Sequence, residues 1–152
     1  MKDRTLRITH TLYAPIEDVW DAWTNPESMK QWLSPEGMTT PDASVDLKVG
    51  GAYRVIMEGK NMPNPDHNGQ MAVGGEYLEI EKPTKLVFTW LWEDSPVDTH
   101  TTKISLLFNK IDENTTELTI THSGFADENM QKEHDMGWKS TLRKLDMFIK
   151  KS

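Results

Sequence analysis

Histidines and carboxylates are the side chains of this sequence that could do chemistry. His122 is the last residue but one of the stretch TTELTITHS, in which Leu118, Ile120 and His122 alternate onto one apolar side. A lone histidine on such a face is usually structural, but one that faces a cavity could orient a ligand or move a proton. His134 precedes Trp138 by about one helical turn, and we expect it to be solvated near the end of a helix.

The sequence gives these histidines no recognisable catalytic or metal-binding partner. It contains no HExxH motif, no histidine pair at ligand spacing, no glycine-rich phosphate loop and no GxSxG elbow. Glu133, His134 and Asp135 are consecutive, so on a helix they point in different directions and make a poor metal site. Glu58 and Glu76 alternate away from the aromatic side of their strands. We therefore predict no catalytic residue, no metal and no cofactor, and we leave open whether the protein is an enzyme.

Composition narrows the class of protein further. The 152 residues are expected to form one domain, 1–152, and carry 17 Lys plus Arg against 24 Asp plus Glu, a formal charge of −7. This acidic balance disfavours a nucleic-acid partner. Cysteine is absent, which excludes disulfides and thiolate chemistry. The sequence shows neither a signal-peptide core nor the ~18 apolar residues of a membrane span, so we expect no membrane insertion and a cytoplasmic location.

The hydrophobic periodicity predicts the elements that would position these residues. Residues 4–13 alternate as a strand, and two short helices begin at Pro15 and Pro26. Residues 39–123 show strands and turns, including a strand with Val45, Leu47 and Val49 on one side. Residues 60–70 form a long polar loop that could act as a lid.

The last predicted element is a helix over residues 130–151. Its apolar stripe consists of Trp138, Leu142, Leu145 and Ile149, spaced four, three and four residues apart. Consecutive hairpins predict an antiparallel sheet of about six to seven strands, and only this helix is long enough to cover its concave face. The predicted fold class is α+β.

Residues on the inward side of these elements are the candidate lining of a ligand site. They are Tyr53, Met57, Phe88, Trp90, Trp92, Phe108, Ile120, His122, Trp138, Leu142 and Leu145. Two interpretations stay open at this point. The side chains either interlock into a solid core, as protein interiors usually do, or they form the apolar wall of a small-molecule site.

Five stretches of the sequence resemble a known family. They are APIEDVWDAWTNPESMKQWL (14–33), DLKVGGAYRV (46–55), GEYLEIEKPTKLVFTW (75–90), TELTITHSGF (116–125) and GWKSTLRKL (137–145). Together they resemble the short bacterial, single-domain form of the family named after the activator of heat-shock protein 90 ATPase, within the START-like, or birch-pollen-allergen-like, superfamily.

The resemblance implies a helix-grip fold, in which a curved antiparallel sheet wraps a long C-terminal helix and leaves a cavity between them. Relatives in the superfamily use that cavity for lipids, sterols, flavonoids and polyketides. Our first hypothesis is therefore binding of a small hydrophobic or aromatic molecule. The alternatives are a cyclase or lyase that uses the same cavity with His122 as proton carrier, and a module that contacts a chaperone.

Overall fold

The computed structural model describes residues 4–63, 68–93 and 101–151. Within them, the elements in chain order are β1 (Thr5–Leu12), α1 (Ile16–Thr24), α2 (Pro26–Trp32), β2 (Met38–Val45), β3 (Ala52–Gly59), β4 (Gly69–Glu81), β5 (Lys85–Trp92), β6 (Thr102–Asp112), β7 (Thr115–Ser123) and α3 (Glu128–Lys151). None of the helices in these residues is long and apolar enough to span a membrane.

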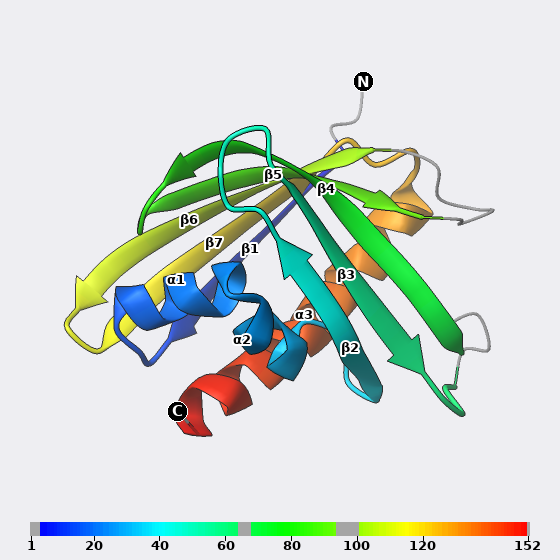
Figure 1. Cartoon of the computed structure of the whole chain (residues 1–152), viewed down its shortest axis with the longest axis horizontal. Coiled ribbons are helices and arrows are strands. Elements are labelled where there is room, and N and C mark those ends of the chain that lie inside the picture. Colours follow the sequence, from blue (N-terminus) through cyan, green and yellow to red (C-terminus); the bar gives the residue numbers. More distant parts are fainter. Residues whose placement is uncertain (1–3, 64–67, 94–100, 152) are drawn as a thin grey trace.

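The strands form one antiparallel sheet in the order β1-β7-β6-β5-β4-β3-β2. From β2 to β7 each strand pairs with the next in sequence. β1 pairs with β7, so β1 and β2 are the two edge strands. The sheet curls around α3, and α1 and α2 lie at one end of its concave face (Figure 1). This arrangement confirms the predicted α+β helix-grip fold.

Proline and asparagine set the starts of the two short helices. Pro15, with φ −58°, immediately precedes α1, and Pro26 occupies the first position of α2. The Asn25 side chain accepts a hydrogen bond from the Glu27 backbone N–H at 3.0 Å, which satisfies one donor at the start of α2. The predicted helix starts are therefore confirmed.

The core lies between the sheet and the helices. The helical stripe of Trp138, Leu142, Leu145 and Ile149 is buried, and the Nε1–H of Trp138 reaches across to the sheet residue His122. At the N-terminal strand, His10 Nε2 lies 2.8 Å from Asp146 Oδ1 of α3. The helix therefore lies on the concave face of the sheet, as its amphipathic pattern predicts.

One predicted strand is wrong. The alternation of Val45, Leu47 and Val49 indicates a strand, but β2 ends at Val45, and Leu47 and Val49 are 40% and 66% exposed. Residues 46–51 instead form a tight turn, in which Gly51 N–H donates to the Lys48 carbonyl at 2.8 Å and Gly50 adopts φ +85°. The predicted lid, 60–70, falls partly on residues 64–67, which lie outside the described residues, and β4 already begins at Gly69.

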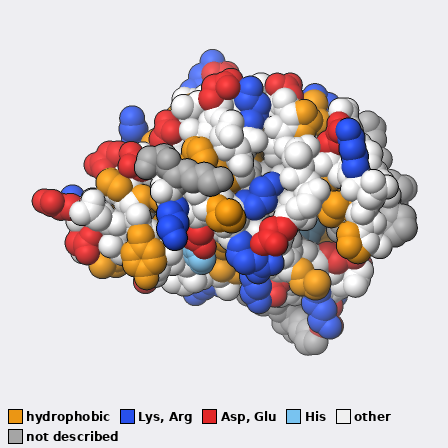
Figure 2. Space-filling view, turned by 90° about the horizontal axis from the view of Figure 1, so that it is seen from below, with side chains coloured by type: hydrophobic (Ala, Val, Ile, Leu, Met, Phe, Trp, Pro, Cys, Tyr) orange, Lys and Arg blue, Asp and Glu red, His pale blue; other side chains and the backbone are white. Residues whose placement is uncertain are grey.

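Positive and negative side chains are interspersed, with scattered hydrophobic ones, on the face seen from below (Figure 2). Several Lys and Arg side chains gather near the middle of this face, with Asp and Glu side chains beside them.

Candidate ligand-binding site

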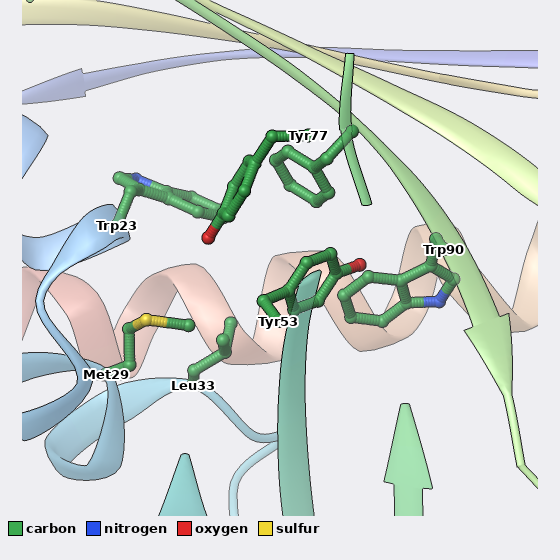
Figure 3. Close-up of a pocket in the computed structure, with 7 residues that line it drawn as sticks. Trp23, Met29, Leu33, Tyr53, Tyr77 and Trp90 are labelled. Atoms are coloured by element: carbon green, nitrogen blue, oxygen red, sulfur yellow. The ribbon is translucent and has the colours of Figure 1, made fainter. Parts of the chain in front are cut away.

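A small void lies where α1 and α2 meet strands β3, β4 and β5. The side chains that line it are Trp23, Met29, Leu33, Tyr53, Tyr77, Phe88 and Trp90 (Figure 3). Its free volume is only about 10 Å³, which is room for about one water molecule. The side chains beneath the sheet therefore pack almost without free space, which is close to the solid core that was one of the two interpretations of the sequence.

The predicted lining residues divide into two groups. Tyr53, Phe88 and Trp90 line the void. The others surround it or lie farther away: Met57, Phe108, Ile120, His122, Trp138, Leu142 and Leu145 are buried in the core, and Trp92 is half-buried at the end of β5.

Four lining residues were not among the candidates. Trp23, Met29 and Leu33 lie on apolar positions of α1 and α2 or just beyond α2, and none of them was predicted to line a site. Tyr77 follows Gly74-Gly75 in β4, and its alternation with Val73 was the signal that could have identified it.

The aromatic wall of the void is held by ring contacts and one strong hydrogen bond. The Tyr53 ring lies 5.3 Å from Phe88 and 5.5 Å from Tyr77, between centroids. The Tyr53 hydroxyl donates to the Thr89 carbonyl at 2.5 Å. Burial raises the pKa of Tyr53 and of Tyr77 above the usual value for a phenol, so both stay neutral at physiological pH.

Glycine makes room for this hydrogen bond in β4. A Cβ on Gly75 would overlap the Thr89 carbonyl oxygen and hydroxyl, and a Cβ on Gly74 would come within 2.6 Å of the Tyr53 carbonyl oxygen. The glycine pair therefore permits the close approach of three strands at the wall of the void.

His122 is part of a chain of hydrogen bonds that runs from Trp138 to the Trp90 carbonyl. Its Nδ1 accepts from Trp138 Nε1–H at 3.1 Å, so in the neutral ring the proton lies on Nε2, which faces Thr102 Oγ1 at 2.7 Å. The Thr102 hydroxyl in turn donates to the Trp90 carbonyl at 3.1 Å. His122 is fully buried, and burial, with a smaller contribution from His134, lowers its pKa to about 2. This histidine is neutral, and both of its ring nitrogens are occupied.

His134 differs from the sequence-based expectation. It was expected to be solvated near the end of a helix, but it is half-buried, and its Nε2 accepts from Trp92 Nε1–H at 3.1 Å. Its Nδ1 lies 2.9 Å from the Met130 carbonyl, so the proton lies on Nδ1. The side chain of Trp92, 42 residues away in sequence, provides the partner that local pattern did not indicate.

Two tryptophans that line the void have no hydrogen-bond acceptor for their indole N–H in the described part of the chain. The Nε1 atoms of Trp23 and Trp90 are buried and lack an acceptor among the described residues. A buried donor without an acceptor costs about 1–3 kcal/mol of stability. The described residues also contain no group of three or more histidine and carboxylate side chains that could hold a metal ion.

Comparison with known proteins agrees with this fold. The family model of Activator of Hsp90 ATPase homolog 1-like proteins matches residues 13–150. A comparison with curated proteins gives no match.

Several solved bacterial structures share the architecture. A protein from Chromobacterium violaceum is 25% identical, with a TM-score of 0.83 and 96% of each chain covered. The AHSA1 protein of Silicibacter pomeroyi is 23% identical, with a TM-score of 0.78 and coverage of 94% of this chain and 95% of that one. CalU16 from Micromonospora echinospora is 25% identical, with a TM-score of 0.68 and coverage of 95% and 75%. Since the family model spans nearly the whole sequence, this chain belongs to the family of Activator of Hsp90 ATPase homolog 1-like proteins.

Proposed function

We propose that this protein binds a small neutral molecule with an apolar or aromatic body in the void between the sheet and helices α1 and α2, without covalent chemistry. The observation that carries the proposal is the lining itself. Seven apolar or aromatic side chains, contributed by α1, by α2 and the residue after it, and by three strands, converge on one point of the interior. Burial of ligand surface there would contribute about 25 cal/mol per Å².

A ligand must enlarge this void, because about 10 Å³ holds no organic molecule. The sheet wall is held by strand pairing and by the bond from Tyr53 to Thr89. The helical wall is more adaptable, because α2 has only seven residues and contributes Met29, whose unbranched side chain can change rotamer. We therefore expect Met29 and Leu33 to move when a ligand enters.

The turn after α2 determines how far that wall can move. Lys144 of α3 donates to Ser34 Oγ at 2.6 Å and to the Met38 carbonyl at 3.0 Å. Ser140 of α3 accepts from the Glu36 backbone N–H at 2.7 Å. These contacts fix the end of α2 to α3, so opening is expected to involve side-chain rearrangement more than a shift of the whole helix.

The geometry favours binding over the cyclase or lyase alternative. A proton carrier needs a free ring nitrogen within reach of a substrate, whereas both nitrogens of His122 are engaged by Trp138 and Thr102. Interaction with a chaperone is supported by the family description alone. Measuring ATP hydrolysis by heat-shock protein 90 with and without this protein tests it directly, and we expect no stimulation.

The binding proposal is tested by titrating ¹⁵N-labelled protein with small aromatic hydrocarbons, a flavonoid and a fatty acid. We expect chemical-shift changes centred on Trp23, Tyr53 and Trp90. Met29→Ala widens the void and should tighten binding of the small aromatics. Met147→Ala is the matched control, because Met147 is 60% exposed on α3 and should change nothing. The proposal fails if no compound shifts these resonances in either the wild type or Met29→Ala.

A further inference from the structure

We infer that the ligand of this site carries a neutral oxygen atom, which accepts a hydrogen bond from the hydroxyl of Tyr77. This inference rests on the proposed function and specifies one chemical group of the ligand. Tyr77 lines the void, and its side chain is almost fully buried, at 2% exposure. Its hydroxyl is a hydrogen-bond donor within an otherwise apolar and aromatic lining, so it can select among molecules of the same shape.

The Tyr77 hydroxyl has no hydrogen-bond partner in the part of the chain that the structure describes. The contacts of this residue are made by its ring and its backbone. Its ring centroid lies 5.5 Å from that of Tyr53 and 6.1 Å from that of Phe88. Its backbone N–H donates to the Gly51 carbonyl at 2.9 Å, and its carbonyl accepts from the Gly50 N–H at 2.8 Å. Since buried polar groups are normally paired, this hydroxyl is suited to an acceptor from outside the chain.

The two tyrosines of the lining direct their hydroxyls to different places (Figure 3). The Tyr53 hydroxyl points away from Met29 and donates to the Thr89 carbonyl. The Tyr77 hydroxyl points into the space between Trp23 and Met29, two other residues of the lining. A ligand that displaces the Met29 side chain would therefore meet the hydroxyl of Tyr77.

The lining also indicates the charge of the accepting oxygen. Lys, Arg and His are absent from the described residues that line the void. A carboxylate placed there would lose its hydration without gaining a cation. Burial raises the pKa of Tyr77 above the usual value for a phenol, so the hydroxyl keeps its proton and can donate it to a hydrogen bond at physiological pH. A neutral carbonyl, ether or hydroxyl oxygen fits this donor.

Acetophenone and α-methylstyrene test this inference, because they have nearly the same shape and differ in the replacement of the carbonyl oxygen by a methylene group. Water solvates the ketone better than the alkene, which lowers the relative affinity of the ketone equally for every variant. The ratio of the two dissociation constants is therefore compared between the wild type and Tyr77→Phe, which keeps the ring and removes the hydroxyl. The ratio should favour the ketone about 5- to 100-fold more in the wild type. The carbonyl stretch of bound acetophenone should lie at lower frequency in the wild type than in Tyr77→Phe.

Tyr13→Phe is the matched control. Tyr13 is 81% exposed and does not line the void, so the loss of its hydroxyl should leave the ratio unchanged. Tyr77→Phe removes no hydrogen bond to the described residues, so it should unfold at the same urea concentration as the wild type or at a higher one. Failure of Tyr77→Phe to fold, or unfolding at a clearly lower urea concentration, would mean that the hydroxyl is needed for the fold, and the inference would be overturned.

The possible results separate this inference from the proposed function. If neither compound binds to the wild type or to Met29→Ala, in which the void is wider, the proposed function fails together with the inference. If the ratio is the same in the wild type and in Tyr77→Phe, or if only the alkene binds, the site takes apolar molecules without using the hydroxyl, and the inference alone is overturned. An equal change of the ratio in Tyr13→Phe overturns it as well.

Discussion

Lowering the pH from 7 to 5 is expected to destabilise the folded protein through His122. In the folded state its pKa is lowered to about 2, mainly because the ring is buried. In the unfolded chain a histidine has a pKa of about 6.5. Between these two values the unfolded state binds a proton that the folded state does not, so stability is complete above about pH 6.5 and falls as the pH decreases.

The size of the effect follows from these two values. Each pH unit well below 6.5 costs about 1.4 kcal/mol, and the loss between pH 7 and pH 5 amounts to about 2 kcal/mol. The result depends little on the folded-state value, because any pKa below about 4 gives nearly the same loss over this interval. A loss of this size is a large fraction of a typical unfolding free energy of about 5–15 kcal/mol.

His122→Gln isolates this contribution. Glutamine does not titrate, and its amide can accept from Trp138 and donate to Thr102. Urea unfolding followed by far-UV circular dichroism at pH 7, 6 and 5 gives the free energy of unfolding of both proteins. The remaining side chains are the same in both proteins, so their contributions cancel in the difference.

The wild type should therefore lose about 2 kcal/mol more than His122→Gln over this interval. Parallel pH profiles of the two proteins would refute the reasoning, since they would mean that His122 gains a proton in the folded state as easily as in the unfolded one. A variant that is less stable at every pH but has a flatter profile agrees with it.

Four further substitutions test the packing of the protein, each by the free energy of unfolding in urea. Trp138→Ala should cost about 4 kcal/mol, because the indole is 4% exposed and its ring centroid lies 5.3 Å from that of Trp90. A cost below about 2 kcal/mol would indicate a void larger than the structure shows. Gly75→Ala should cost about 1–3 kcal/mol by forcing β4 away from β5. The control is Gly137→Ala in α3, where nothing lies near the new Cβ, and it should stabilise the protein by about 0.5–1 kcal/mol. Equal effects of the two substitutions would contradict this account. Lys144→Met should cost about 1 kcal/mol by removing two charge-assisted hydrogen bonds to the turn after α2, and a neutral result would show that the turn holds without it.

Most of the secondary structure could be predicted from local pattern. Phe88, Trp90 and Trp92 alternate along β5, and the prediction that they face one side is confirmed, as is the stripe of α3. Such patterns are readable because side-chain direction repeats every two residues in a strand and every 3.6 in a helix. The error at residues 46–49 arose where this rule is weakest, because a short alternating run beside two glycines fits a turn equally well.

The candidate site could be predicted only in part. Tyr53, Phe88 and Trp90 were identified because the pleat of a strand fixes their direction. Trp23 and Met29 were not predicted as lining, since the direction of a short helix face depends on how the helix docks against the sheet. The partners of Trp92 and Trp138 were likewise not predictable, because each lies on another element.

The sequence by itself determined which side chains turn inward, because that depends on the backbone period within each element. The tertiary structure alone decided how much space is left among them and which buried donors find acceptors. The free volume of about 10 Å³ is a small difference between the volume that the curled sheet encloses and the volume of the side chains that fill it. No local pattern carries that difference. The same holds for the indole N–H groups of Trp23 and Trp90, which lack an acceptor among the described residues and whose surroundings come from elements far apart in the chain.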